Sequence, residues 1–272
     1  MPEGHPGLLP GPSAHDPPVA PSGAPEPSPV LPERLCPAVL DLSGLDLSGV
    51  RARAPVPRAL RGPLELYLAR VGEQDGAALR QAGTVLDAEE RARARAFRHD
   101  RDRDAYVVAH AALRGVLSVV LGMRAEALPL AREPCAGCGG PHGRPVVRTP
   151  GVHFSLSHSG GLVLVALAPA PVGVDVEELA TAQAVLSAQS ALHPAEADEL
   201  ARLPGYGRPA AFTQAWVRKE AYLKALGTGL VRDPALDYLG TGPAPTDPAP
   251  GWAVRDVVVP AGYAAAVARR AP

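Results

Sequence analysis

The sequence is poor in cysteine, in net charge and in long hydrophobic runs. Its three cysteines among 272 residues are an odd number and too few for a disulfide framework, which favours a reducing, cytoplasmic location. Because 27 Lys and Arg residues nearly balance 28 Asp and Glu residues, no global basic field exists to hold nucleic acid or an anionic membrane. The longest apolar stretch, residues 162–174, is interrupted by prolines and is too short to span a bilayer. Any site for a polyanion must therefore be local.

Residues 1–33 consist mostly of proline, glycine, alanine and serine and have almost no periodic apolar pattern. Such a segment cannot bury enough surface to offset its ordering entropy, so we predict a disordered tail. It lacks the basic start and apolar run of a secretory signal, and its composition is not that of an Arg-rich transit peptide. We expect folded structure to begin near Pro63.

The remaining chain predicts an α+β fold, because helical and strand periodicities alternate in both of its halves. Helices are expected over residues 86–97, 102–121, 194–203 and 209–226, with Asp87 as an N-cap and Gly227 as a C-terminal glycine. Strands are expected over residues 64–69, 152–156, 162–168, 172–177, 253–259 and 263–268. Long loops rich in glycine and proline are expected over residues 129–151 and 240–251.

The segment Gly-Val-Asp-Val-Glu at residues 173–177 carries the most informative pattern. Residues two apart on a strand share one face, so Asp175 and Glu177 present paired carboxylates while Val174 and Val176 are buried on the other face. This pairing suits a hard cation such as Mg²⁺, which takes oxygen ligands together with substrate phosphate. Taken alone, the pair is more simply explained as two solvated acids on an exposed strand.

The helix expected over residues 209–226 supplies a third acid. Trp216, Glu220 and Lys224 are four residues apart and share one helix face. On a bare surface, Glu220 and Lys224 would form an ion pair worth only about 0.3 kcal/mol. The tryptophan on the same face favours partial burial, and a partly buried acid needs a partner. Together with the two strand acids, Glu220 could complete an octahedral metal site.

Cationic side chains offer candidate anion sites. In Ser157-His158-Ser159 a histidine stands at a strand end beside a small-residue turn, where it could donate to an anion or simply serve the turn. A Ser–His hydrolase dyad is disfavoured, because Ser157 and His158 are adjacent and point apart on a strand. Further candidates, each of which could also be simply solvated, are Arg91, Arg93, Arg95 and Arg144.

Cys135, Cys138 and His142 have part of a zinc-ligand spacing. A closed structural zinc site needs four ligands, and the other cysteine, Cys36, belongs on this interpretation to the N-terminal tail. Two hypotheses stay open: a zinc site, or a loop with two free thiols.

Taken in order, these motifs resemble the 4′-phosphopantetheinyl transferases of the long, surfactin-synthetase-activator type. The resemblance covers about residues 60–270, and its most specific part is Gly-x-Asp-x-Glu at residues 173–177 followed by Trp-x-x-Lys-Glu-x-x-x-Lys at residues 216–224. It implies two similar α+β halves, residues 60–170 and 171–272, related by pseudo-twofold symmetry, with the active site in the cleft between them.

The same resemblance implies a reaction and a set of partners. The phosphopantetheine arm of coenzyme A, the co-substrate, would move to a serine of an apo acyl or peptidyl carrier protein, with release of 3′,5′-ADP. The carrier would belong to fatty-acid, polyketide or nonribosomal-peptide biosynthesis. We expect a cytoplasmic monomer with no nucleic-acid or membrane partner.

Site roles also follow from the resemblance, residue by residue. Asp175, Glu177 and Glu220 would hold Mg²⁺, for which Mn²⁺ can substitute, at the pyrophosphate. Glu220 could also help to deprotonate the carrier serine, and Lys224 is a candidate acid for the leaving oxygen. The residues implied to bind coenzyme A are Arg93, Arg144, Ser157, His158, Lys219 and Lys224, with Arg93 and His158 at the 3′-phosphate and Arg144 at the adenosine-phosphate end.

Two competing functions belong to other classes. One is a zinc-dependent interaction module built on Cys135, Cys138 and His142, which would hold one tight zinc ion and need no magnesium. The other is an inactive carrier-binding scaffold, against which the intact acids and Lys224 argue.

Overall fold

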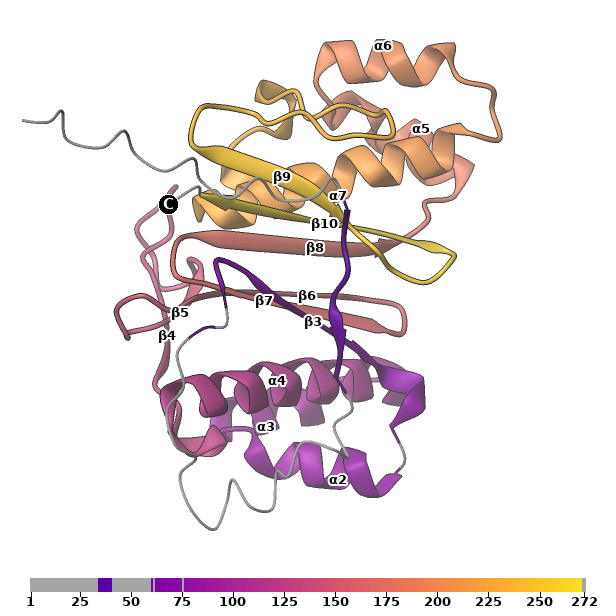
Figure 1. The fold of residues 1–272 in the computed structure, drawn as a ribbon. Coiled ribbons are helices and arrows are strands. Elements are labelled where there is room, and N and C mark those ends of the chain that lie inside the picture. Colours follow the sequence, from indigo (N-terminus) through magenta and orange to yellow (C-terminus); the bar gives the residue numbers. More distant parts are fainter. Residues whose placement is uncertain (1–33, 41–59, 61, 75, 271–272) are drawn as a thin grey trace, which may run out of the picture.

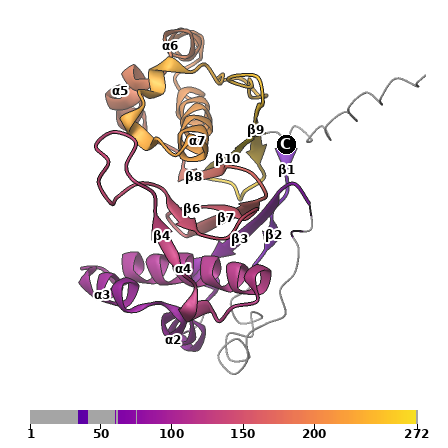
Figure 2. The ribbon, with the colours of Figure 1, turned by 90° about the vertical axis from the view of Figure 1, so that its left-hand side faces the viewer.

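The computed structural model describes residues 34–40, 60, 62–74 and 76–270, and the tail expected over residues 1–33 lies outside them. Two four-stranded sheets lie face to face, with helices on the outer face of each (Figure 1). A quarter turn shows the same four layers from the side (Figure 2). This mixed arrangement is the α+β class that the sequence predicts.

Each sheet combines strands that are distant in the sequence. The first sheet has the order β2 (Ala38–Val39), β3 (Glu65–Arg70), β7 (Leu162–Ala168) and β6 (His153–Ser159). The second sheet has the order β1 (Arg34–Leu35), β9 (Trp252–Val257), β10 (Tyr263–Arg270) and β8 (Val172–Glu178). A separate hairpin pairs β4 (Leu130–Arg132) with β5 (Pro145–Val147).

Helices cover the two outer faces. Those beside the first sheet are α2 (Gly76–Val85), α3 (Ala88–Ala96) and α4 (Asp100–Leu121). Those beside the second sheet are α5 (Ala182–Ala188), α6 (Pro194–Arg202) and α7 (Arg208–Leu226). Short 3₁₀ turns are η1 (Val71–Glu73), η2 (Ala125–Ala127), η3 (Gln189–Ala191), η4 (Gly229–Val231) and η5 (Pro234–Leu236).

The two sheets repeat one order of elements. The first is built by the sequence β3-α4-β6-β7 and the second by β8-α7-β9-β10. In each, the strand that comes last in the sequence lies between the other two and is antiparallel to both. One short parallel strand then extends each sheet, β2 beside β3 and β1 beside β9.

Period-two alternation directs side chains into separate apolar layers. On β7, residues 163, 165 and 167 pack with α4, whereas the even-numbered residues pack between the sheets with the valines of β8. On β10, Ala264, Ala266 and Ala268 face α7 instead. Both faces of each sheet are therefore covered, which is why β7 is buried along its whole length.

Helix α4 has the length and composition of a membrane span, but it is a core helix here. Of its most apolar 18-residue window, 78% is buried inside the protein. The expected valines and alanine on one face, Val108, Ala112 and Val116, all lie in the core cluster. Its apolar composition is accounted for by this packing.

Three expectations about the fold are wrong. Folded structure does not begin near Pro63, because β1 and β2 precede it and pair with β9 and β3. Helices α2 and α5 were not expected, and residues 129–151 are not one loop but contain the β4–β5 hairpin. Strands β1, β2, β4 and β5 have two or three residues, which is too short for periodicity to distinguish them from loops.

Asp87 caps α3 as predicted, and the cap joins a buried ion network. The carboxylate of Asp87 accepts the N–H of Glu90, and that of Glu90 accepts the N–H of Asp87. The Arg114 guanidinium, with no exposed surface, donates to Glu90 Oε2 at 2.6 Å and to Asp87 Oδ2 at 2.5 Å. His110 Nδ1 lies 2.8 Å from Glu90 Oε1. This network ties the start of α3 to the middle of α4.

Glu90→Gln should destabilise the protein, and by less as the pH falls. Burial favours the neutral acid, but hydrogen bonds from His110 and Arg114 outweigh it and lower the pKa of Glu90 to about 2. The folded-state pKa lies below the unfolded value, so the stabilisation is complete above pH 4.5 and is lost as the pH falls toward 2. We expect a loss of up to about 3 kcal/mol at neutral pH in urea unfolding. Glu89→Gln, at an exposed position in the same turn, should change little; an equal loss there would contradict this account.

Candidate active site

The polar residues of interest line a seam between the edge strands β6 and β8. The Ser157 hydroxyl donates to Asp175 Oδ1 at 2.7 Å, and the Ser159 hydroxyl donates to Glu177 Oε2 at 2.7 Å. Ser155 Oγ accepts a backbone N–H of β8 at 3.0 Å. Alternate serines of β6 thus contact successive parts of β8, and the two sheets are joined along the strand that carries the acids.

The expected alternation on β8 is confirmed. Val174 and Val176 are buried between the sheets, so Gly173, Asp175 and Glu177 share the opposite face, the one covered by α7. Asp175 is only 1% exposed. The acids are therefore partly enclosed, and the reading of two solvated acids is wrong.

Helix α7 presents the other acid to the same place. Helix α7 runs unbroken through Trp216, Glu220 and Lys224, so their spacing of four places them on one face, and all three are half-buried. Lys224 Nζ lies 2.6 Å from Asp175 Oδ1 and donates to Ser157 Oγ at 3.1 Å. One lysine thereby connects α7, β8 and β6.

The surroundings of Glu220 and Glu177 favour their neutral forms. Burial raises the pKa of Glu220 above its usual value, Asp175 and Glu177 raise it further, and Lys224 opposes them. Burial also raises the pKa of Glu177, against the lowering effect of its Ser159 hydrogen bond. Like charges held close together favour a shared proton or a bound cation.

This donor set fits a hard divalent cation. Asp175 Oδ2 is buried and has no hydrogen-bond partner among the described residues, and all the donors are oxygens of the kind that Mg²⁺ and Mn²⁺ prefer. The three carboxylates are spread more widely than a preformed cage, because the compact donor groups of the described residues, with all atoms within 4.8 Å, do not include them.

A second group of residues connects Arg93 with His158. The Arg93 guanidinium lies 5.9 Å from the centre of the Tyr106 ring, and the Tyr106 ring lies 4.1 Å from that of His110. Partial burial lowers the pKa of His158, as do the nearby His110 and Lys224. The two residues assigned to the 3′-phosphate thus flank one region, bridged by an aromatic ring and a histidine.

Tyr106 and His110 were missed at the sequence level. They are four apart on α4, and with Arg114 they form a polar stripe at helical spacing. That helical spacing is the signal in the sequence that indicates them.

Arg144 lies beside the C-terminal end of α7. Its guanidinium donates to Ala225 O at 3.1 Å and pairs with Glu133 at 2.9 Å. It also lines a pocket of about 460 Å³ between the β4–β5 hairpin and the start of β6, together with Arg132 and Arg148. The described lining includes none of the three carboxylates, so this pocket offers a separate, cationic surface.

Lys219 is placed wrongly by the sequence reading. Its side chain is 1% exposed, pairs with Glu196 at 2.7 Å and donates to the carbonyls of Pro234 and Asp237. One residue along a helix turns about 100° around its axis, so Lys219 faces away from Glu220's partners. Its contacts are those of a structural ion pair, and a phosphate contact does not fit them.

A comparison with protein families finds a similarity over this region. A family model described as the 4′-phosphopantetheinyl transferase superfamily matches residues 171–244. The matched segment includes β8 and α7 and therefore all three carboxylates and Lys224.

Individual relatives extend the match. The 4′-phosphopantetheinyl transferase HetI of Nostoc sp. (strain PCC 7120) is 29% identical over 216 residues, which are 75% of this chain and 87% of the relative. The 4′-phosphopantetheinyl transferase psf-1 of Bacillus pumilus is 41% identical over 95 residues, or 33% of this chain and 38% of that protein. The 4′-phosphopantetheinyl transferase gsp of Aneurinibacillus migulanus is 32% identical over 79 residues, or 29% of this chain and 33% of that protein.

Proposed function

We propose that this chain is a 4′-phosphopantetheinyl transferase of the surfactin-activator type, which moves the phosphopantetheine arm of coenzyme A onto a carrier-protein serine. The family model over residues 171–244 and the similarity to HetI and psf-1 support this. The serine oxygen attacks the phosphorus that bears the pantetheine arm, and the bond from that phosphorus to 3′,5′-ADP breaks. The observation that carries the proposal is the meeting of Asp175, Glu177, Glu220 and Lys224 at the seam of β6, β8 and α7.

Each side chain in the seam has a task in this reaction. Asp175, Glu177 and Glu220 would hold Mg²⁺, for which Mn²⁺ can substitute. When bound, the ion supplies positive charge to the diphosphate and its leaving group. Glu220, whose pKa is raised by burial, accepts the serine proton directly or through water. Lys224 donates to the leaving oxygen.

The remaining cations would bind coenzyme A. Arg93 holds the 3′-phosphate as a cation and His158 holds it as a hydrogen-bond donor, because that anion needs local partners on a chain of net charge −1. Arg144 contacts the adenosine-phosphate end, and its position in the wall of a cationic pocket supports this. The Ser157 hydroxyl, already bonded to Asp175 and Lys224, contributes from β6.

The two halves would be related by pseudo-twofold symmetry. Residues 60–170 and 171–272 each supply a strand, a long helix and a hairpin, and that shared order supports the assignment. Since β6 belongs to one half and β8 to the other, the active site would lie in the cleft between the halves. This division leaves out strands β1 and β2, because both precede residue 60.

The substrates would be coenzyme A and an apo acyl or peptidyl carrier protein of fatty-acid, polyketide or nonribosomal-peptide biosynthesis. A monomer suffices, because one chain supplies all three carboxylates and Lys224. Three free cysteines support a cytoplasmic location.

Mass spectrometry of apo carrier proteins tests the proposal. After incubation with coenzyme A and Mg²⁺, a carrier should gain one phosphopantetheine group, and the same carrier with its serine replaced by alanine should not. EDTA should abolish transfer and added Mg²⁺ should restore it. A protein that binds carriers from each of the three classes without changing their mass would be a scaffold, and transfer undiminished in EDTA would remove the metal from the proposal.

His158→Ala should discriminate between two forms of the coenzyme. Loss of a charge-assisted contact to the 3′-phosphate should weaken coenzyme A binding by roughly 1.5–3 kcal/mol, about 10- to 100-fold. Dephospho-coenzyme A lacks that phosphate and should bind almost as before. Isothermal titration calorimetry with both ligands measures the difference, and an equal loss for the two would show that His158 acts elsewhere.

A further inference from the structure

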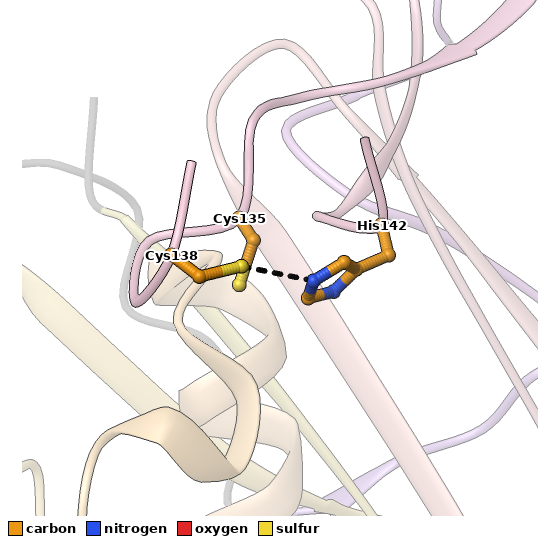
Figure 3. A group of neighbouring side chains, drawn as sticks. All are labelled: Cys135, Cys138 and His142. Atoms are coloured by element: carbon orange, nitrogen blue, oxygen red, sulfur yellow. Dashed lines mark hydrogen bonds between the residues drawn. The ribbon is translucent and has the colours of Figure 1, made fainter. Parts of the chain in front are cut away.

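The loop between β4 and β5 brings together three soft donor atoms that the proposed reaction does not use. The donor atoms of Cys135, Cys138 and His142 all lie within 4.8 Å of one another. Cys138 Sγ is 3.1 Å from His142 Nε2. Figure 3 shows the two sulfur atoms and the imidazole turned toward one another. Within the described part of the chain, no other three His, Cys, Asp or Glu donors are this compact.

The backbone holds these donors in place. The N–H of Cys135 donates to Gly140 O and the N–H of Gly139 donates to Cys135 O, both at 2.8 Å. Gly139 has φ of +72°, in the left-handed region that favours glycine. The N–H of Gly140 points at Cys138 Sγ, 3.4 Å away. The loop is thus folded into a tight turn that places both sulfurs on one side.

The base of the loop is equally constrained. The N–H of Gly143 donates to Glu133 O at 3.1 Å, and a Cβ on Gly143 would lie 2.3 Å from that oxygen. Gly137, at the tip, lies against Val231 of η4, where an added Cβ would be 2.7 Å from Val231 Cγ1. The loop therefore contacts the segment that directly follows α7.

We propose that Cys135, Cys138 and His142 bind one Zn²⁺ ion, through two thiolates and His142 Nε2, with water in the fourth tetrahedral position. Thiolate and imidazole ligands select zinc over magnesium, which prefers oxygen. Cys138 and His142 are exposed, so water reaches the open position. The site is separate from the carboxylate site in both position and ligand chemistry.

Zinc at this point would fix the loop that leads into Arg144. His142 is two residues from Arg144, whose guanidinium reaches Ala225 O at the end of α7. Metal binding closes the turn between Glu133 and Arg144 and removes its freedom to open. Amides in residues 133–144 should therefore exchange more slowly with deuterium in the zinc form, and an unchanged exchange rate would overturn this ordering of the loop.

Metal titration of the reduced full-length chain tests the site. One tightly bound zinc per chain is expected by elemental analysis after gel filtration. Co²⁺ in place of zinc should give a thiolate-to-cobalt charge-transfer band, which reports sulfur ligation directly. Cys138→Ser and His142→Gln should each weaken zinc binding by at least about 100-fold. Because both residues are exposed, the circular dichroism spectra of the two variants should match that of the wild type.

Cys36→Ser is the matched control, because Cys36 is also exposed but lies outside the donor cluster. It should keep the full zinc content. The proposal is overturned if the reduced chain binds no stoichiometric zinc, if Cys138→Ser retains the zinc, or if the cobalt complex lacks the charge-transfer band. None of these measurements uses transfer activity, so their outcome does not depend on the proposed reaction.

Discussion

A Glu220→Gln variant should lose transfer by about 10²–10³-fold, the usual scale for one preorganised electrostatic contact, while its metal-free form stays folded. The glutamine keeps the shape and the helix propensity of the side chain but removes its charge. Asp175 and Glu177 raise the pKa of Glu220, so the ionised acids repel one another in the metal-free protein. Neutralising one of them should leave thermal stability unchanged or slightly higher.

The pH dependence of that stability has a defined sign. Because the folded-state pKa of Glu220 is raised, its ionisation weakens the fold as the pH rises above the ordinary value of 4.5. Any advantage of Glu220→Gln should therefore appear at neutral pH and vanish in acid. Thermal melts at several pH values, on the preparation used for single-turnover transfer, measure both effects.

Glu178→Gln provides the matched control for charge. Glu178 is the last residue of β8, is exposed, and should leave transfer near the wild-type rate when neutralised. If Glu220→Gln unfolds but keeps its rate per folded molecule, the residue is structural and the metal site loses its third ligand.

Local spacing predicted the pair of residues on the strand and the pair on the helix, but it did not predict that the two pairs lie together. Asp175 and Glu177 are two apart on a strand, and Glu220 and Lys224 are four apart on a helix, so each pair follows from backbone geometry. The Lys224–Asp175 contact joins residues 49 positions apart, and no periodicity specifies which helix covers which strand. Only the family resemblance placed them together.

For Lys219 the sequence-based prediction failed in the opposite way, because it assigned a contact that the fold does not make. The motif placed it beside Glu220 in the sequence, but its partner Glu196 comes from α6 and is fully buried. An interpretation of the sequence that treats charged residues as solvated does not predict an acid so deeply buried at the N-terminus of a helix. The longer strands and the helices α3, α4, α6 and α7 were predicted, whereas α2 and α5 were missed. Strands β1 and β2 were missed too, and they are stabilised by partners more than 25 residues away.

Gly173 explains why the strand motif starts with glycine, and it gives the second large effect. A Cβ at Gly173 would lie 2.1 Å from Ala221 O and 2.4 Å from Ala225 N, both backbone atoms of α7. Real Cβ contacts are not that short, so Gly173→Ala must push α7 away from β8. We expect a loss of about 1–3 kcal/mol or more in unfolding free energy, the range for overpacking a tight interface.

Gly205→Ala is the control, because an added Cβ there meets no heavy atom within 4 Å in the part of the chain that the structure describes. It should melt like the wild type, and a Gly173→Ala protein with wild-type melting temperature and transfer rate would refute the close approach.

The Gly173→Ala variant should also lose transfer at temperatures where it remains folded. Lys224 lies on α7 and Asp175 on β8, so separating helix from strand lengthens their 2.6 Å contact and displaces Glu220 with it. The two shortest contacts of the added Cβ are to backbone atoms of α7, and the third, at 2.9 Å, is to Lys224 Cβ. Removing the side chains of Ala221 and Ala225 should therefore not restore the rate. A triple variant with Ala221→Gly and Ala225→Gly therefore distinguishes the two origins of the defect. Recovery of transfer in it would show that side-chain crowding, rather than backbone contact, requires glycine at position 173.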